Sequence, residues 1–120
     1  MALILVVDDE HLLAMLLADT LTDEGHEVVM ASNGRAALER IRERRPAVVI
    51  TDFMMPIMTG LEFAEAVHAD AEIADIPIIL LSGAQGSLAR QRSELFFAVF
   101  DKPFDIQAFL IEVRNAIAQT

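Results

Sequence analysis

Apolar residues are grouped along this chain in short blocks, and two different spacings alternate. Five blocks are runs of mostly β-branched or aliphatic residues, the pattern of strands buried on both faces of a sheet. The block at 27–31 contains a charged residue, which predicts an edge strand. The predicted strands are residues 3–7, 27–31, 48–52, 78–81 and 97–100.

Between these blocks, apolar residues recur every three or four positions, which is the spacing of one helix face. The predicted helices span residues 10–24, 33–45, 61–68, 87–95 and 105–118. In the first helix, the residues expected to be buried are Leu13, Leu16, Leu17 and Leu21. In the last helix, they are Phe109, Leu110, Val113 and Ile117.

Residues that favour helix-terminal positions mark the ends of these helices. Gly25 is placed to stop the first helix. Ser32 or Asn33 can cap the second helix, and the pair Thr59-Gly60 can open the third. The boundaries therefore agree with the periodicity.

Strands that alternate with helices through short connections predict a parallel sheet covered on both faces, of the α/β class. With five strands, we expect the flavodoxin-like doubly wound order 2-1-3-4-5. The length of 120 residues predicts one domain over residues 1–120, with no output domain in this chain.

Composition excludes several classes of function. A net charge of −10 disfavours direct contact with nucleic acid or an anionic membrane, and favours cationic partners and metal ions. No apolar run approaches the ~20 residues of a membrane span, and no basic signal region precedes the first strand. The absence of cysteine fits a reducing compartment. We therefore expect a cytoplasmic protein.

Polar residues that can bind a ligand or take part in a reaction lie at the ends of four of the five predicted strands. Asp8 and Asp9 follow the first strand, Asp52 ends the third, Ser82 follows the fourth and Lys102 comes just after the fifth. Each residue alone could be an ordinary loop residue. Because the carboxyl ends of parallel strands meet at one edge, their joint occurrence indicates a site.

The residues at these strand ends could act together on one ligand. Carboxylates about 4 Å apart repel by roughly 4 kcal/mol at an effective dielectric near 20, so the cluster needs a cation. Oxygen ligands select a hard ion such as Mg²⁺. With Lys102 and the Ser82 hydroxyl, the set suits a transferring phosphoryl group. Asp52 stands apart from the Asp8-Asp9 pair and is the better candidate nucleophile.

The chain resembles, almost end to end, the receiver domain of response regulators in two-component signalling, the CheY-like superfamily. The resemblance implies that Asp52 accepts a phosphoryl group from a phosphohistidine on a histidine kinase or phosphotransfer protein. The protein would then be a phosphoprotein switch rather than an enzyme, apart from catalysing its own phosphorylation and slow dephosphorylation. The matching segments are Val6-Val7-Asp8-Asp9-Glu10, Asp52-Phe53-Met54-Met55-Pro56 followed by Gly60, Ile76-Pro77-Ile78-Ile79-Leu80-Leu81-Ser82, and Lys102-Pro103-Phe104.

The same resemblance implies roles for the other site residues. Asp9, Asp52 and the backbone carbonyl of Met54 would bind Mg²⁺, with Asp8 acting through water. Lys102 would contact the phosphoryl group, before a cis peptide to Pro103. Ser82 would be the switch hydroxyl, drawn inward when the phosphoryl group is present.

Several positions depart from the family pattern. Val99 occupies the place, three residues before the lysine, where receivers usually carry an aromatic switch residue. Leu95-Phe96 replaces the usual glycine-alanine turn before the fifth strand. Met54 and Ala84 offer no polar group that could orient water at the phosphoryl group. These departures indicate an unusual output face.

Two surfaces are expected to contact partners. The phosphodonor would dock beside Asp52 against the first helix, where Ala14, Met15 and Ala18 offer a mildly apolar face. Output would pass through the fourth helix, fifth strand and fifth helix, to a downstream protein or to a second copy in a homodimer.

Other functions of this fold class fit less well. A flavin phosphate needs a Ser/Thr/Gly-rich loop after the first strand, and here that loop is acidic. A haloacid-dehalogenase-type phosphatase needs an aspartate two residues after its nucleophile, where Met54 stands. His11, His26 and His68 have no metal-ligand spacing and are expected to be exposed. The remaining alternative is a receiver-like interaction module that works without phosphorylation.

Overall fold

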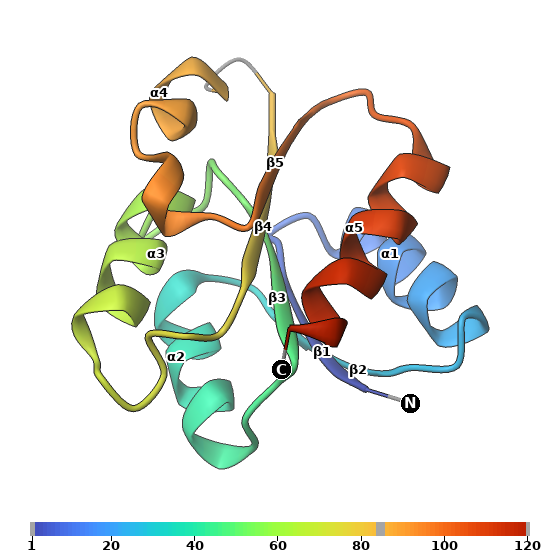
Figure 1. Ribbon diagram of the computed structural model, residues 1–120, viewed down its shortest axis with the longest axis horizontal. Helices are drawn as coiled ribbons and strands as arrows, with labels where there is room; N and C mark the ends of the chain where they lie inside the picture. Colours follow the sequence, from blue (N-terminus) through green and yellow to red (C-terminus); the bar gives the residue numbers. More distant parts are fainter. Residues whose placement is uncertain (1, 84–85, 120) are drawn as a thin grey trace.

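A parallel sheet of five strands lies between two layers of helices (Figure 1). The computed structural model describes residues 2–83 and 86–119. No helix within these residues is both long and apolar enough to cross a membrane. The elements are β1 (Leu3–Val7), α1 (His11–Asp23), β2 (Glu27–Ala31), α2 (Gly34–Glu43), β3 (Val48–Asp52), α3 (Gly60–Ala69), β4 (Ile78–Ser82), α4 (Gly86–Arg90), a 3₁₀ turn η1 (Ser93–Leu95), β5 (Ala98–Asp101) and α5 (Ile106–Ala118).

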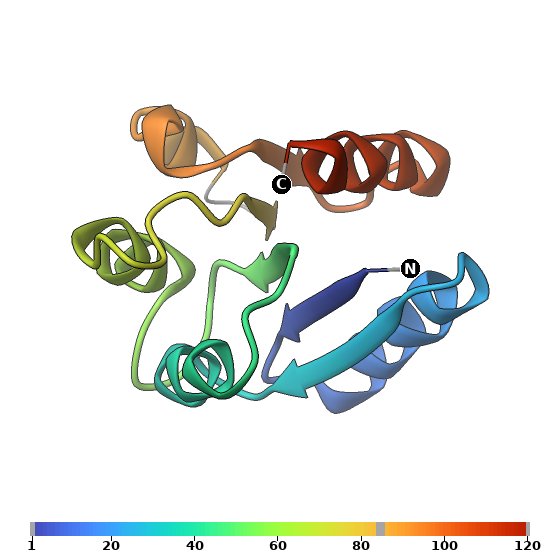
Figure 2. The same ribbon diagram turned by 60° about the horizontal axis from the view of Figure 1, so that its bottom comes forward.

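The strands follow the order β2-β1-β3-β4-β5, and every neighbouring pair is parallel. The predicted order 2-1-3-4-5 is therefore confirmed, and β2 is an edge strand as expected. Helices α1 and α5 cover one face of the sheet, and α2, α3 and α4 cover the other (Figures 1 and 2).

The core has two halves because successive residues of a strand point to opposite faces. Leu5 and Val7 of β1 pack in the cluster with residues of α2 and α3. Ile4 and Val6 pack in the cluster with residues of α1 and α5. In strands buried on both faces, polar side chains are concentrated near the carboxyl ends, and here these ends carry Thr51, Asp52 and Ser82.

The helix ends predicted at Gly25, Asn33 and Thr59 are confirmed. Gly25 has φ +94°, the left-handed conformation that ends α1. The Asn33 side chain accepts a hydrogen bond from the Ala36 N–H at 2.8 Å and caps α2. Thr59 and Glu62 form a reciprocal capping box at the start of α3. This cap fixes where the loop after Asp52 must end.

The predicted buried face of α1 is partly wrong. Leu13 and Leu16 are 38% and 63% exposed, whereas Ala14 and Leu21 are buried in the core. The inward stripe follows the small residue at position 14, which lets α1 approach the sheet closely. Ala14 is therefore not available on the outer face, and exposed leucines take its place there.

The segment 87–95 is not one helix as predicted. It comprises the short helix α4 and the turn η1. The Arg92 N–H bonds to the carbonyl of Ala89, three residues back, and the Arg92 side chain pairs with Glu65 of α3 at 2.9 Å. The chain turns toward α3 at this point, which lets Leu95 enter the core. Strand β5 then starts one residue later than predicted and includes Asp101.

Positive and negative residues are separated along the chain. Residues 1–34 contain seven Asp and Glu residues but no Lys or Arg, whereas residues 35–45 contain five of the nine cations. Three of these arginines are paired: Arg40 contacts Glu43 at 3.1 Å, while Arg44 contacts Glu27 and Arg45 contacts Asp75, each at 2.6 Å. The α1 side of the molecule is thus acidic, and the segment 35–45, which comprises most of α2 and the two residues after it, carries more than half of the cations.

Candidate functional site

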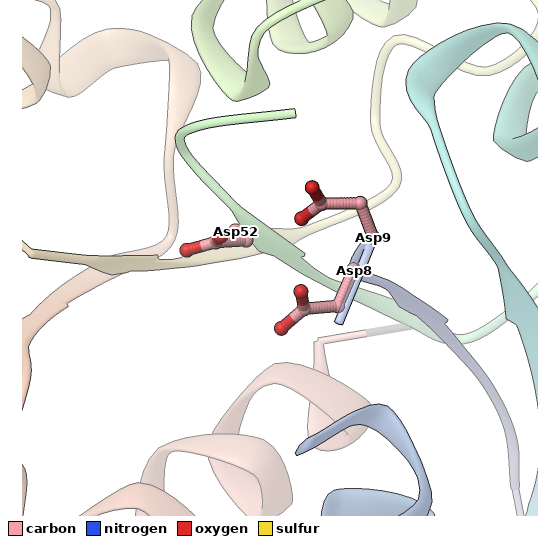
Figure 3. A group of neighbouring side chains, drawn as sticks. All are labelled: Asp8, Asp9 and Asp52. Atoms are coloured by element: carbon pink, nitrogen blue, oxygen red, sulfur yellow. The ribbon is translucent and has the colours of Figure 1, made fainter. Parts of the chain in front are cut away.

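Three carboxylates gather at the carboxyl ends of β1 and β3 (Figure 3). Asp8 and Asp9 directly follow β1, and Asp52 is the last residue of β3. One oxygen of each lies within 4.8 Å of the others. Asp8 is buried, the Asp52 side chain is 12% exposed, and Asp9 is exposed. The oxygen-only donor set is compatible with a hard divalent cation such as Mg²⁺.

Asp8 is held in an unfavourable environment for its charge. Its Oδ1 accepts a hydrogen bond from the Glu10 N–H at 2.9 Å, which fixes the side chain at the turn into α1. Burial raises the pKa of Asp8, and the negative charges of Asp52 and Asp9 raise it further, against the lowering effect of that hydrogen bond and of Lys102. The metal-free cluster therefore opposes folding.

The variant Asp8→Asn is expected to stabilise the metal-free protein at neutral pH. The amide oxygen can still accept the Glu10 N–H, while the buried charge and its repulsion are removed. The gain should be roughly 1 kcal/mol or more, the scale of one close like-charge contact. Urea unfolding in EDTA, followed by circular dichroism, measures it. A variant less stable than the parent would contradict this account.

The pH dependence of that gain has a definite sign. Because the folded pKa of Asp8 lies above its unfolded value of 3.8, ionisation of Asp8 costs stability as pH rises through the folded pKa. The parent should lose this contribution and Asp8→Asn should not. The stability difference should therefore grow above about pH 4 and then level off. A difference independent of pH would exclude Asp8 as its source.

Lys102 contacts the nucleophile candidate directly. Its Nζ donates to Asp52 Oδ1 at 2.9 Å, and its side chain is 31% exposed. The Lys102 N–H donates to the Ser82 carbonyl at 2.7 Å, which ties the end of β5 to the end of β4. The peptide between Lys102 and Pro103 is cis, as the family resemblance implies. The site thus pairs its partly buried carboxylate with one fixed ammonium group.

Ser82 places an unused hydroxyl beside these groups. The residue is fully buried at the end of β4, and its Oγ has no hydrogen-bond partner among the described residues. A buried hydroxyl without a partner costs about 1–3 kcal/mol. A ligand oxygen brought within its reach would remove that cost.

The loop after Asp52 is closed tightly at its base. The Gly60 N–H donates to the Phe53 carbonyl at 2.7 Å. A Cβ at Gly60 would collide with the Asp52 carbonyl oxygen and lie 3.0 Å from the Phe53 Cα. At the loop tip, Ile57 adopts φ +73°, unusual for a β-branched residue. Met54, whose carbonyl the family resemblance assigns to the metal, is 57% exposed.

The variant Gly60→Ala is expected to lower the free energy of unfolding by about 1–3 kcal/mol, because backbone atoms cannot move aside for the new methyl group. Gly83→Ala is the matched control, since a Cβ there meets nothing within 4 Å. That control should leave stability unchanged or raise it by up to about 1 kcal/mol. Chemical denaturation of both variants tests the contrast, which equal losses would contradict.

Four further residues that bear on the sequence-based expectations are Val99, Ala84, His26 and Asp101. Val99 is half-buried and packs against the cluster that contains Phe53 and Ala89. Ala84 lies outside the described residues. His26 is half-buried rather than exposed, because its Nδ1 accepts the Ala2 N–H at 3.3 Å, and this burial lowers its pKa. Asp101, which the sequence analysis did not single out, pairs with an arginine of α4.

A groove larger than those beside the carboxylates lies elsewhere. It has a volume of about 640 Å³ and lies at the amino-terminal edge of β4 and β5, lined by residues such as His68, Pro77 and Phe96. None of the strand-end carboxylates or Lys102 lines it. The chemistry of the side chains, and not the size of the hollow, therefore identifies the candidate site.

Comparison with known proteins agrees with this arrangement. The profile of the response regulator receiver domain matches residues 4–114. Response regulator MprA of Mycolicibacterium vanbaalenii is 33% identical, over 98% of this chain and 51% of its own length, so the chain spans about half of that relative. Sporulation initiation phosphotransferase F of Bacillus subtilis is 30% identical, over 95% of this chain and 89% of its own.

A solved structure is similar over the whole length. The response regulator receiver domain protein of Clostridium thermocellum has a TM-score of 0.89 and 29% identity, covering 99% of this chain and 96% of its own. The strand order, the carboxylate cluster and the matched profile agree with one another. This chain belongs to the receiver domains of response regulators, the signalling switches of two-component systems.

Proposed function

We propose that Asp52 accepts a phosphoryl group from a phosphohistidine of a histidine kinase or phosphotransfer protein. The observation that carries the proposal is the convergence of three carboxylates, one ammonium group and one unpartnered hydroxyl at the same strand ends. Of the carboxylates, Asp52 is the one whose oxygen already contacts Lys102. Its partial exposure leaves a path for a donor.

In the proposed transfer, an Asp52 carboxylate oxygen attacks phosphorus, a P–O bond forms and the P–N bond to the donor imidazole breaks. The imidazole nitrogen keeps the electron pair of that bond. Asp8, Asp9, Asp52 and the Met54 carbonyl would hold Mg²⁺, which when bound supplies positive charge against the carboxylates and phosphoryl oxygens. Lys102 would exchange its contact with Asp52 for one with a phosphoryl oxygen.

The Ser82 hydroxyl links the transfer to a change of conformation. A phosphoryl oxygen on Asp52 would give this buried hydroxyl the acceptor that it lacks. That contact favours the conformation in which Ser82 is drawn toward the phosphoryl group. Phosphorylation then shifts the population of two existing states, which is how we propose that the receiver signals.

The donor would dock against α1, beside Asp52. Of the residues expected there, Ala14 is buried, Ala18 is half-buried and Met15 is exposed. Three leucines of α1 are exposed as well, at positions 12, 13 and 16. A groove of about 340 Å³ runs from this helix past Phe104 toward Lys102. The acidic surroundings of α1 suit a donor with basic residues at its rim.

Downstream, the switch would act through α4, β5 and α5, on a target protein or in a homodimer. The net charge of −10 supports protein partners rather than direct contact with nucleic acid or membrane. A cytoplasmic location, with the described chain acting as a single receiver domain, completes the proposal.

Intact mass spectrometry after incubation with acetyl phosphate, or with phosphoramidate as a P–N donor, tests the proposed function. With Mg²⁺ the chain should gain the mass of one phosphoryl group, and with EDTA it should gain none. Loss of the added mass in hydroxylamine would identify an acyl phosphate. Absence of labelling by both donors, in a folded protein that also fails to bind Mg²⁺ by calorimetry, would leave the phosphorylation-independent interaction module.

A further inference from the structure

Helix α4 is held to the sheet by few contacts. It is five residues long, and Leu88 on its outer side is 50% exposed. On its inner side, Ala89 is buried against Phe53 and Leu80. The ion pair of Arg90 with Asp101 at the end of β5 is a second anchor (the two elements adjoin in Figure 1). The position of so short a helix depends on these contacts.

Asp101 contacts α4 at two points. Its two carboxylate oxygens lie 3.3 and 3.2 Å from the two terminal nitrogens of Arg90, a two-point contact. The Asp101 carboxylate also lies against the first residue of the helix, Gly86, where a Cβ would collide with it. One side chain therefore touches α4 at its beginning and, through Arg90, at its end.

The same aspartate is joined to the site. Asp101 is paired in register with Ser82 across β4 and β5, and Lys102 follows it in the chain. The Lys102 N–H bonds to the Ser82 carbonyl at 2.7 Å, and its Nζ bonds to Asp52. A displacement of Ser82 or Lys102 therefore moves the strand end from which Asp101 reaches α4.

We propose that the Arg90–Asp101 pair is a latch that holds α4 in the resting arrangement and lowers the affinity of the site for a phosphoryl group. Arg90 and Asp101 are positioning residues, since neither touches Asp52. The inference rests on the proposed function, because the latch opposes the movement of Ser82 and Lys102 toward a phosphoryl group. It gives this receiver, which has Val99 at the usual aromatic position, a polar link between its site and α4.

The size of the effect follows from the exposure of the pair. The two side chains are 51% and 54% exposed, and pairs of this kind contribute little to stability. If the latch exists only in the resting state, its free energy favours that state over the one that binds a phosphoryl group. Its removal therefore raises the population of the binding-competent state by the factor to which that free energy corresponds. The dissociation constant for a phosphoryl analogue should then fall about two- to five-fold.

Beryllofluoride with saturating Mg²⁺ is the probe, and calorimetry measures its dissociation constant, because the chain has no Trp or Tyr for fluorescence. Arg90→Gln and Asp101→Asn should each bind it about two- to five-fold more tightly than the parent. Gly86→Ala, which displaces the Asp101 carboxylate sterically, should act in the same direction. Arg90→Lys keeps the charge and should restore most of the parental value.

Arg44→Gln is the matched control, because Arg44 is 56% exposed and also pairs with a carboxylate, that of Glu27. Arg44 follows α2 and Glu27 lies on β2, the strand at the opposite edge of the sheet from β5. Arg44→Gln should leave the dissociation constant for beryllofluoride unchanged. Parental affinity in both Arg90→Gln and Asp101→Asn, or an equal gain in Arg44→Gln, would overturn the latch. Failure of the parent to bind beryllofluoride at all would instead contradict the proposed function.

Discussion

The variant Asp52→Asn is expected to take up no phosphoryl group under conditions in which the parent takes up one. The amide is almost equal in size to the carboxylate but has no nucleophilic oxygen, so labelling should fall by several orders of magnitude. Lys102 also loses the charged partner that it contacts at 2.9 Å. Intact mass after incubation with acetyl phosphate and Mg²⁺ measures the loss.

A matched control separates this effect from a general loss of acidic charge. Asp19→Asn removes an exposed carboxylate from α1, away from the strand ends, and should be labelled at the parental rate. Labelling of Asp52→Asn at that same rate would mean that another residue is the acceptor. Peptide mapping of the labelled variant would then identify it among the neighbouring carboxylates.

The variant Phe109→Ala is expected to lose about 3–5 kcal/mol of stability, the usual cost of removing a buried aromatic ring. Phe109 has no exposed surface, and its ring centroid lies 6.0 Å from that of Phe100 and 5.4 Å from that of Phe104. These three rings lie directly behind the strand end that carries Lys102. Thermal and urea unfolding followed by circular dichroism measure the loss.

Ile111→Ala on the same helix provides the comparison. Ile111 is 51% exposed, so its truncation should cost less than about 1 kcal/mol. Equal losses in the two variants would show that α5 is not anchored through the aromatic cluster. In a folded Phe109→Ala protein, the rate of labelling should also fall, because the strand end behind Lys102 is less well supported.

The fold is predictable from the sequence where burial leaves no alternative. The runs at β1, β3 and β4 must be covered on both faces, which requires a parallel sheet between helices. The buried face of α1 is not predictable in the same way. Leucines at 12, 13 and 16 satisfy several possible stripes, and only packing against the sheet selects Ala14 and Leu21. Likewise, the turn that ends α4 depends on the distant pair of Arg92 with Glu65.

The sequence predicts which residues form the candidate site, but not how buried or how hydrogen-bonded they are. Topology alone brings the ends of β1, β3, β4 and β5 to one edge, so the residues at those ends can be named from the sequence. Neither the burial of Asp8 nor the unpartnered hydroxyl of Ser82 follows from it. Both depend on how closely the loops pack, and the loop after Asp52 is set by the close approach of Gly60.

The separation of charge between α1 and α2 has a consequence for the kinetics of association. A cationic partner is attracted to the acidic side of the molecule before any contact forms, and the arginines of residues 35–45 repel it from their side. Such steering raises the encounter rate and orients the approaching partner. Since salt screens long-range attraction more than close contacts, added salt should slow association and leave dissociation nearly unchanged.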